Sequence, residues 1–246
     1  MCTLTLVPLP DGSIRLAFNR DERRTRPAAL PPLRRRFGSH DAVLPIDPPG
    51  GTWLAVNDAG LALALLNVNP SGNDAEPRRA ARSRGEIIPD LLSSDSLDEV
   101  IERGQAVAAT DFAPFCLVAV SEGVFAEAVS DGRRIRPGRG GAIAAPEMCT
   151  SSGLGDDRVD GPRRRLFTEM FAAGDWPTQQ AAYHRHSWPG REALSVCMSR
   201  ADACTVSHVV VDIGETAAVM TYFSGSPDRT TDASMAYLVF HPVRVR

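Results

Sequence analysis

The second residue of the chain, directly after the initiator methionine, is a cysteine, Cys2. Because cysteine is small, removal of Met1 is expected to leave Cys2 as the N-terminal residue. An N-terminal cysteine places an α-amine, with a pKa of about 7.7 to 8.0, a few bonds from a thiol with a pKa of about 8.5. One residue then supplies both a nucleophile and its general base, and the chemistry requires no histidine.

Polar residues are predicted to lie beside this cysteine. Residues 3–18 favour a hairpin of two short strands around a type I turn at residues 9–12, where the proline and glycine suit the second and fourth turn positions. A tight turn pairs Cys2 with Asn19, whereas a one-residue bulge at the turn glycine pairs it with Arg20. Either register brings the run that begins at Asn19 next to the thiol.

Arg20 and Asp21 would then set the electrostatic environment of Cys2. An unperturbed thiol is only about 3% ionised at pH 7, and the Arg20 cation would favour the thiolate. Asp21 is a candidate to hold Arg20 or the α-ammonium in place. The alternative interpretation is that Cys2 is an incidental residue on an edge strand.

Several stretches near the N-terminus follow one pattern, namely residues 1–4, 18–22, 26–27, 51–57 and 60–67. Together they resemble the NRDE family, also called the transport and Golgi organisation protein 2 family. The resemblance continues more loosely through residues 150–153 and 162–164. The same landmarks are similar to those of the cysteine N-terminal-nucleophile (Ntn) hydrolases, which include penicillin V acylases, bile-salt hydrolases and acid-ceramidase-like amidases.

The resemblance implies an α+β fold, an αββα four-layer sandwich of two antiparallel sheets, formed as a single domain over residues 1–246. It places Cys2 at the end of a central strand. The implied activity is cleavage of a small non-peptide amide, an acylated amine, through an acyl-enzyme on Cys2. The implied mechanism needs no metal or organic cofactor.

The resemblance also implies site residues. Cys2 would be nucleophile and base, Asp21 would bind the α-amine, and the Asn19-Arg20 step would orient the thiolate. Asn67 matches the family's oxyanion-hole asparagine, because Asn57, Gly60, Leu61 and Asn67 keep the order of the hydrolases' Asn-x-x-Gly-Leu stretch. An amide N–H there would donate to the tetrahedral oxyanion.

Two positions depart from the amidase pattern. Where the amidases have a second asparagine, this chain has Thr150-Ser151-Ser152-Gly153, so the donor would be the Ser151 hydroxyl or a backbone N–H. The arginine expected on a C-terminal strand has a loose counterpart in Arg200. These departures keep alternatives open: a carrier for haem or an acyl-CoA-like or lipid-like ligand with the same cleft, or an interaction scaffold without a small-molecule site.

Composition excludes several classes of function. The chain has 246 residues, a net charge of −3 and 43% hydrophobic residues, so it lacks the basic field of a general nucleic-acid binder. Its longest nearly apolar stretch, residues 61–68, is too short to span a bilayer. The N-terminus lacks the features of a signal peptide, which predicts a cytoplasmic protein.

All 27 residues counted as lysine or arginine are arginine. This bias is typical of GC-rich bacterial genomes, so clusters of arginine are not taken as evidence of a functional site.

Secondary structure is expected to run from strands through helices to strands, which is typical of an α+β fold. Trp53 is expected to pack as core beneath the second hairpin. The expected strands are 3–7, 13–18, 52–56, 61–67, 115–120, 124–129, 205–212, 217–223 and 235–240; the expected helices are 83–109 with a break, 161–173 with Pro162 near its first turn, and 177–187; residues 23–49 and 136–141 are expected to be irregular loops.

Two further signals are weak. His184 and His186 are two positions apart, so on a helix they point in different directions, and no third ligand stands at a familiar spacing. Arg23, Arg24 and Arg26 beside the expected cleft could attract an anionic group such as a carboxylate, a CoA phosphate or haem propionates, but the arginine-rich composition favours a solvated loop over this role. The oligomeric state does not follow from these patterns.

Overall fold

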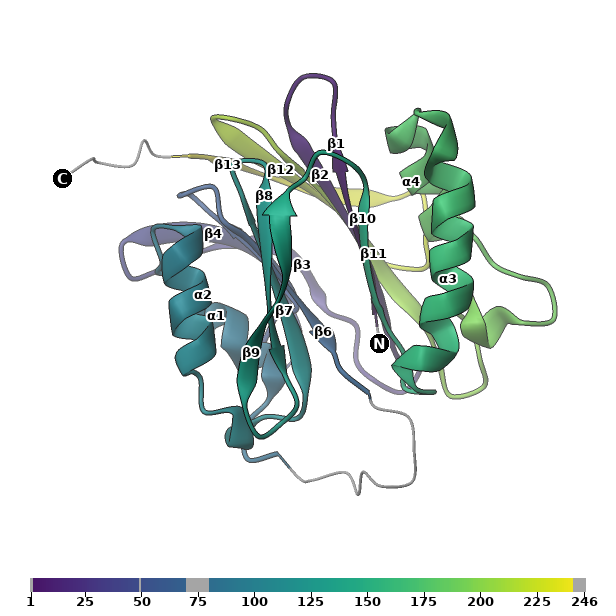
Figure 1. The fold of residues 1–246 in the computed structure, drawn as a ribbon, viewed down its shortest axis with the longest axis horizontal. Coiled ribbons are helices and arrows are strands. Elements are labelled where there is room, and N and C mark those ends of the chain that lie inside the picture. The colour runs from purple at the N-terminus through teal and green to yellow at the C-terminus, as the bar shows by residue number, and fades with distance from the viewer. Residues whose placement is uncertain (1, 49, 70–79, 241–246) are drawn as a thin grey trace.

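Two antiparallel sheets lie face to face in the middle of the molecule (Figure 1). This computed structural model describes residues 2–48, 50–69 and 80–240. Sheet A runs in the order β10 (Glu147–Ser151), β1 (Cys2–Pro8), β2 (Ile14–Arg23), β11 (Ala203–Ile213), β12 (Ala217–Phe223) and β13 (Ala233–Val239). Sheet B runs in the order β3 (Leu30–Phe37), β4 (His40–Ile46), β5 (Leu54–Asn57), β6 (Ala62–Asn67), β7 (Phe115–Ser121), β8 (Val124–Ser130) and β9 (Ile135–Ala142).

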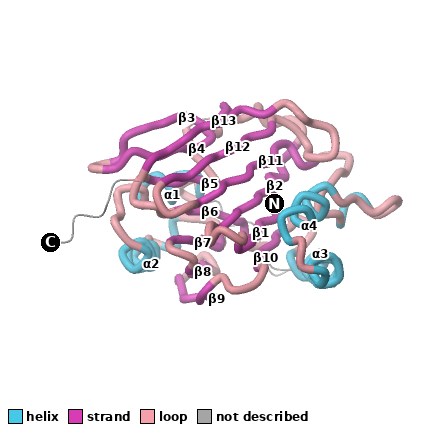
Figure 2. The backbone as a smooth tube through the Cα atoms, turned by 90° about the horizontal axis from the view of Figure 1, so that it is seen from above, coloured by secondary structure: helices cyan, strands magenta, loops and turns pink. Residues whose placement is uncertain are grey.

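Helices cover the outer faces of both sheets (Figure 2). On sheet B lie α1 (Ile87–Leu91) and α2 (Leu97–Ala106), and on sheet A lie α3 (Asp156–Met170) and α4 (Trp176–Arg185). Short 3-10 helices are η1 (Arg84–Glu86), η2 (Ala109–Asp111), η3 (Phe171–Ala173) and η4 (Glu192–Leu194). The predicted αββα sandwich is therefore confirmed, whereas its extent as one domain over the whole chain stays a prediction.

The strand period of two divides the side chains of β1 between two environments. Leu4 and Leu6 are fully buried in the core between the sheets, because alternate residues of a strand point to the same face. Thr3 and Thr5 are equally buried on the opposite face, below α3 and α4. This second face therefore has to satisfy buried polar groups through hydrogen bonds.

The N-terminal hairpin adopts the register with a bulge at its turn. The Gly12 N–H donates to the Leu9 carbonyl at 3.0 Å, and Gly12 has a φ of +86°, a conformation that glycine adopts without steric cost. As a result Cys2 pairs with Arg20 rather than with Asn19. Of the two registers that the sequence allows, the bulged one is confirmed.

A hairpin, β3 and β4, occupies much of the segment expected to be an irregular loop. β3 is the edge of sheet B, and its pairing with β4 shifts register between Leu30 and Leu33, where Pro31 and Pro32 lie. Edge strands tolerate proline at such irregularities, and charged side chains protect them from pairing with other chains. The features that suggested a loop are thus features of an edge strand.

Two more expectations were wrong in detail. Residues 136–141 belong to β9, which is the other edge of sheet B and has its own register shift against β8. Helix α3 begins at Asp156 rather than at residue 161, so Pro162 lies inside the helix instead of in its first turn. Two consecutive aspartates at the start of α3 favour this earlier beginning, because carboxylates are stabilised at the N-terminus of a helix.

The other predicted strands and helices are present close to their expected bounds, although β10 was not expected. None of the helices in the described ranges has the length and apolar character needed to cross a bilayer.

Candidate active site

Cys2 is the first residue of β1, which lies between β10 and β2 in sheet A. Its side chain faces the core between the two sheets and is 6% exposed. Its backbone nitrogen donates a hydrogen bond to Ser151 Oγ at 3.1 Å. If Met1 is removed, this nitrogen becomes the α-amine; Met1 itself lies outside the described residues. Ser151 thus contacts the nitrogen that the predicted chemistry uses as a base.

The start of β1 lies near the point marked N in Figure 1. The Cys2 thiol lines a cleft of about 410 Å³ at this end of the sandwich. The cleft combines residues from β1, β2 and β6 with the segments before β5 and around η1. Its lining residues include Cys2, Arg20, Asp21, Glu22, Arg26, Asp47, Thr52, Trp53, Leu65, Asn67 and Arg84. This volume can hold a small molecule and is polar around the thiol.

Burial raises the pKa of the Cys2 thiol above its ordinary value, and the Asp21 carboxylate raises it further. The Arg20 cation and a backbone hydrogen bond from Asp21 act in the opposite direction but are outweighed by burial. The resting thiol is therefore mainly neutral. Attack on a carbonyl requires a base beside it, as the α-amine of an N-terminal cysteine would be.

Arg20 is fixed against one wall of the cleft. Its Nη2 lies 2.7 Å from Asp47 Oδ1 and 3.6 Å from Glu22 Oε2, and its guanidinium carbon lies 4.2 Å from the centre of the Trp53 ring. Arg26 also pairs with both carboxylates. Because two cations share two anions, Arg20 contributes less positive charge to the thiol than an unpaired arginine would.

Asp21 is buried on the other face of β2 and accepts a hydrogen bond from Thr205 Oγ1 at 2.6 Å. Burial raises the pKa of Asp21 to about 6, while Arg163 and Arg200 oppose this rise. Asp21 is therefore mostly ionised at pH 7. An ionised, buried carboxylate near the N-terminal residue is well suited to bind an ammonium group.

The raised pKa of Asp21 predicts a dependence of stability on pH. The folded state binds this proton more tightly than the unfolded state, so the carboxyl's contribution is greatest below about pH 4 and is lost as pH rises to about 6. A rise from 3.8 to about 6 corresponds to about 3 kcal/mol. We expect the isosteric variant Asp21→Asn to gain stability relative to wild type between pH 4 and pH 7. Urea unfolding at pH 4 and pH 7 measures the free energy of unfolding of both proteins. If the difference between variant and wild type is the same at both pH values, the prediction is wrong.

Asn67 lies at the end of β6 and lines the same cleft as Cys2. No hydrogen bond joins its amide to another group in the described part of the chain. Asp156 links the segments that follow β6 and β10. Its carboxylate accepts hydrogen bonds from the Asn69 and Ser152 backbone N–H groups at 2.8 and 2.7 Å. The end of β6 and the end of β10 are thereby tied together beside the thiol.

Two residues expected at the site lie elsewhere. The Asn19 amide donates to the carbonyls of His184 and Val196, and its oxygen lies 2.8 Å from His208 Nδ1. These contacts are on the face of sheet A opposite the thiol. In the bulged register Asn19 pairs with Thr3, and the side chains of Thr3 and Cys2 point to opposite faces because they are consecutive residues of one strand. Arg200 pairs with Asp202 and is not among the residues that line the cleft.

Three residues that shape the cleft were not predicted to be part of the site. Trp53, expected only as core, also forms the surface against which Arg20 stacks. Asp47 holds two arginines, and Arg84 enters from η1. Arg84 was discounted together with the other arginines because of the arginine-rich composition.

The sequence pattern of Transport and Golgi organisation 2 matches residues 1–130, which is more than half of the chain. The chain belongs to the Transport and Golgi organisation 2 family. The match contains Cys2, Asn67 and Arg84, whereas Ser151 lies beyond it.

Solved structures place this member of the Transport and Golgi organisation 2 family in the Ntn-hydrolase fold. Penicillin V acylase from Agrobacterium tumefaciens has a TM-score of 0.53 and 13% identity, covering 97% of this chain and 86% of that chain. Two variants of the conjugated bile acid hydrolase from Clostridium perfringens have TM-scores of 0.52 and 0.51, each with 11% identity and covering 98% of this chain and 97% of that chain. At such identities the likeness shows the fold alone. No sequence match was found among curated proteins.

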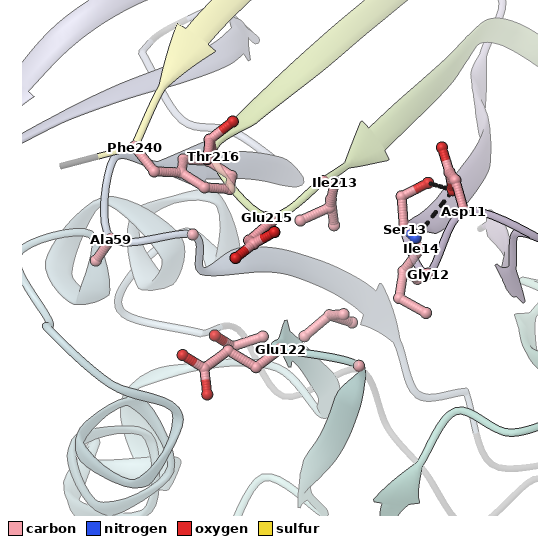
Figure 3. Close-up of a pocket in the computed structure, with 15 residues that line it drawn as sticks. Asp11, Gly12, Ser13, Ile14, Ala59, Glu122, Ile213, Glu215, Thr216 and Phe240 are labelled. Atoms are coloured by element: carbon pink, nitrogen blue, oxygen red, sulfur yellow. Dashed lines mark hydrogen bonds between the residues drawn. The ribbon is translucent and has the colours of Figure 1, made fainter. Parts of the chain in front are cut away.

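A larger cavity, of about 1000 Å³, lies at the opposite end of the sandwich (Figure 3). It is formed by the turns that join β1 to β2, β5 to β6, β7 to β8 and β11 to β12, and it contains Asp11, Glu122 and Glu215. Its described lining has neither cysteine nor histidine. For this Transport and Golgi organisation 2 family member, the smaller cleft at Cys2 is therefore the candidate active site.

The two histidines flagged in the sequence do not form a metal site with other described residues. His184 is fully buried, with its Nε2 2.8 Å from Thr5 Oγ1, and burial lowers its pKa well below the ordinary value. His186 follows the end of α4. His184 therefore serves to pack α4 against sheet A as a neutral side chain.

Proposed function

We propose that the protein is an Ntn-type amidohydrolase that cleaves a small non-peptide amide, an acylated amine, through an acyl-enzyme on Cys2. The observation that carries the proposal is the placement of Cys2, whose thiol lines the cleft while its backbone nitrogen contacts Ser151 Oγ at 3.1 Å. In the processed chain one residue would present a nucleophile and a base to the same bound amide.

In the first half-reaction, Cys2 Sγ forms a bond to the amide carbonyl carbon and the thiol proton passes to the α-amine. The tetrahedral intermediate then collapses, the carbon–nitrogen bond breaks, and the α-ammonium gives its proton to the leaving amine. This leaves a thioester on Cys2. In the second half-reaction, water attacks the thioester with the α-amine as base, releasing the carboxylic acid and restoring the thiol.

The other residues of the site assist this chemistry in distinct ways. The Asn67 amide, which has no partner in the described part of the chain, would donate to the oxyanion of each tetrahedral intermediate. Ser151 would accept a hydrogen bond from the α-amine and so orient its lone pair. Asp21 would stabilise the α-ammonium that forms transiently. Asn19 would act only by fixing β2 through its contacts with α4 and β11.

The test combines peptide mapping with a substrate screen on protein produced from its native start. After brief exposure to limiting iodoacetamide near pH 7, we expect Met1 to be absent and Cys2 to be labelled before Cys116 and Cys197, whose pKa values burial raises to about 12. We also expect release of amine from at least one N-acyl amine in a panel.

Two results would overturn the proposal. Retention of Met1 would place the α-amine on the wrong residue. Absence of turnover, together with a thermal shift on addition of a CoA ester or haem, would favour the alternative in which the same cleft binds such a ligand without cleaving it.

A further inference from the structure

Arg84 is a half-buried cation in the wall of the Cys2 cleft. Its Nη1 donates to the Pro114 carbonyl at 2.8 Å, and no other hydrogen bond joins its guanidinium to the described residues. A guanidinium has five N–H donors in a planar fork. Most of its capacity to donate is therefore unused at the surface of the cleft.

The backbone around Arg84 is held firmly in place. Ser83 caps η1, with its side chain accepting from the Gly85 N–H and its own N–H donating to Glu86. Gly85 lies directly against Gly51: a Cβ on Gly51 would come within 2.9 Å of Gly85 Cα. The Thr52 N–H donates to the Gly85 carbonyl at 3.0 Å. This contact between two glycines fixes η1, and with it Arg84, against the segment before β5 that also carries Trp53.

The other charges of the cleft neutralise one another. Arg20 and Arg26 pair with Asp47 and Glu22. Glu86, which also lines the cleft, pairs with Arg82, a residue that is not among those that line it. Among the residues that the structure describes, Arg84 has no carboxylate within ion-pair distance.

Its environment disfavours a cation that has no counter-ion. Burial lowers the pKa of Arg84, while the Cys2 thiolate and Glu22 oppose this effect. A buried charge is costly unless it is paired, and a carboxylate is the planar anion that best matches a guanidinium fork. A bound carboxylate would supply the pairing that the described side chains do not.

We infer that Arg84 binds a carboxylate of the substrate, so that the substrates are acyl amides that carry a carboxylate close to the scissile bond. This inference rests on the proposed function and deepens it by naming a substrate class. Because Arg84 and Cys2 line one cleft of about 410 Å³, the carboxylate and the amide belong to the same small molecule. N-acyl amino acids carry the carboxylate on the amine side, and N-alkyl succinamates carry it on the acyl side.

The experiment measures binding to the full chain with Cys2→Ala, in which neither turnover nor a thiolate contributes. The probes are N-acylglycines with acyl chains of different lengths, each matched with its neutral N-acylethanolamine, and N-alkyl succinamates matched with their methyl esters. We expect at least one carboxylate probe to bind about tenfold or more tighter than its neutral partner. Adding Arg84→Gln is expected to abolish that preference.

Two further variants make the result specific. Arg133→Gln removes the same charge from an exposed side chain outside the cleft, and is expected to leave the preference unchanged. Arg84→Lys retains a positive charge without the planar fork and is expected to keep part of the preference. Circular dichroism confirms that each variant is folded.

The outcomes separate this inference from the proposed function. Equal binding of charged and neutral probes, a preference that survives Arg84→Gln, or no binding of any pair would overturn the inference, even if the wild-type protein hydrolyses neutral amides. An Arg84-dependent preference in a protein that hydrolyses none of the probes would support the carboxylate site and count against the amidase.

Discussion

Replacement of Cys2 by alanine is expected to lower kcat/KM for an acyl amide by about 10⁴-fold or more, because loss of a covalent nucleophile removes the acyl-enzyme route. The fold should remain, since the substitution removes one sulfur atom from the edge of the inter-sheet core. A stability loss of about 1 kcal/mol is expected from that change. Steady-state kinetics with the best substrate from the panel measure the rate, and thermal unfolding measures the stability.

A second cysteine provides the matched control. Cys197 is also buried, and its Sγ lies 3.2 Å from Asp228 Oδ1, away from the cleft. We expect Cys197→Ala to keep the wild-type rate within a few-fold. Turnover that survives in Cys2→Ala would show that the thiol is not the nucleophile and would move the interpretation to ligand binding.

Replacement of Arg163 by methionine is expected to destabilise the protein by about 3 to 5 kcal/mol, because removing one partner leaves the rest of a buried polar network unsatisfied. Arg163 is completely buried on α3. Its Nη1 donates to Thr3 and Thr150 at 2.9 and 2.7 Å, and its Nε and Nη2 donate to the carbonyls of Leu194 and Ser195 at 3.0 and 2.6 Å.

Arg164, the next residue along α3, provides the control, because its replacement by methionine removes the same charge without disturbing the buried network. Arg164 is half exposed and pairs with Asp160, four residues earlier on α3. We expect Arg164→Met to cost about 0.5 kcal/mol or less. Denaturant unfolding of both variants measures the difference, and equal losses would contradict the importance assigned to Arg163. Because Thr3 and Thr150 adjoin Cys2 and Ser151, Arg163→Met should also weaken any hydrolytic activity.

The fold was predictable from the sequence where hydrophobic patterns are strong. The buried strands β5, β6, β7 and β8 have apolar runs bounded by turn residues, and their positions are confirmed. The edge strands β3 and β9 were not predictable, because both are rich in proline, arginine or glycine and so resemble loops. The exact hairpin register depended on the conformation of a single residue, Gly12.

The candidate site divides in a similar way. Cys2, Arg20, Asp21 and Asn67 could be identified from motifs, and the structure places all four on the lining of one cleft. Arg84 could not, because its position depends on a contact between η1 and the segment before β5, and no local pattern records such a long-range contact. The side-chain direction of Asn19 depends on the register between β1 and β2. The sequence allowed two registers, so this direction could be known only from the structure.

The strand order of sheet A also constrains when the site is assembled during synthesis. β1 has β10 as its neighbour on one side and β2 on the other, so sheet A cannot close around Cys2 until the ribosome has released residues 147–151 of β10. At roughly 5 to 20 residues per second, that delay is roughly 7 to 30 seconds after β1 has emerged. During this interval the start of β1 is open to aminopeptidases, and it becomes buried only when translation has passed the middle of the chain.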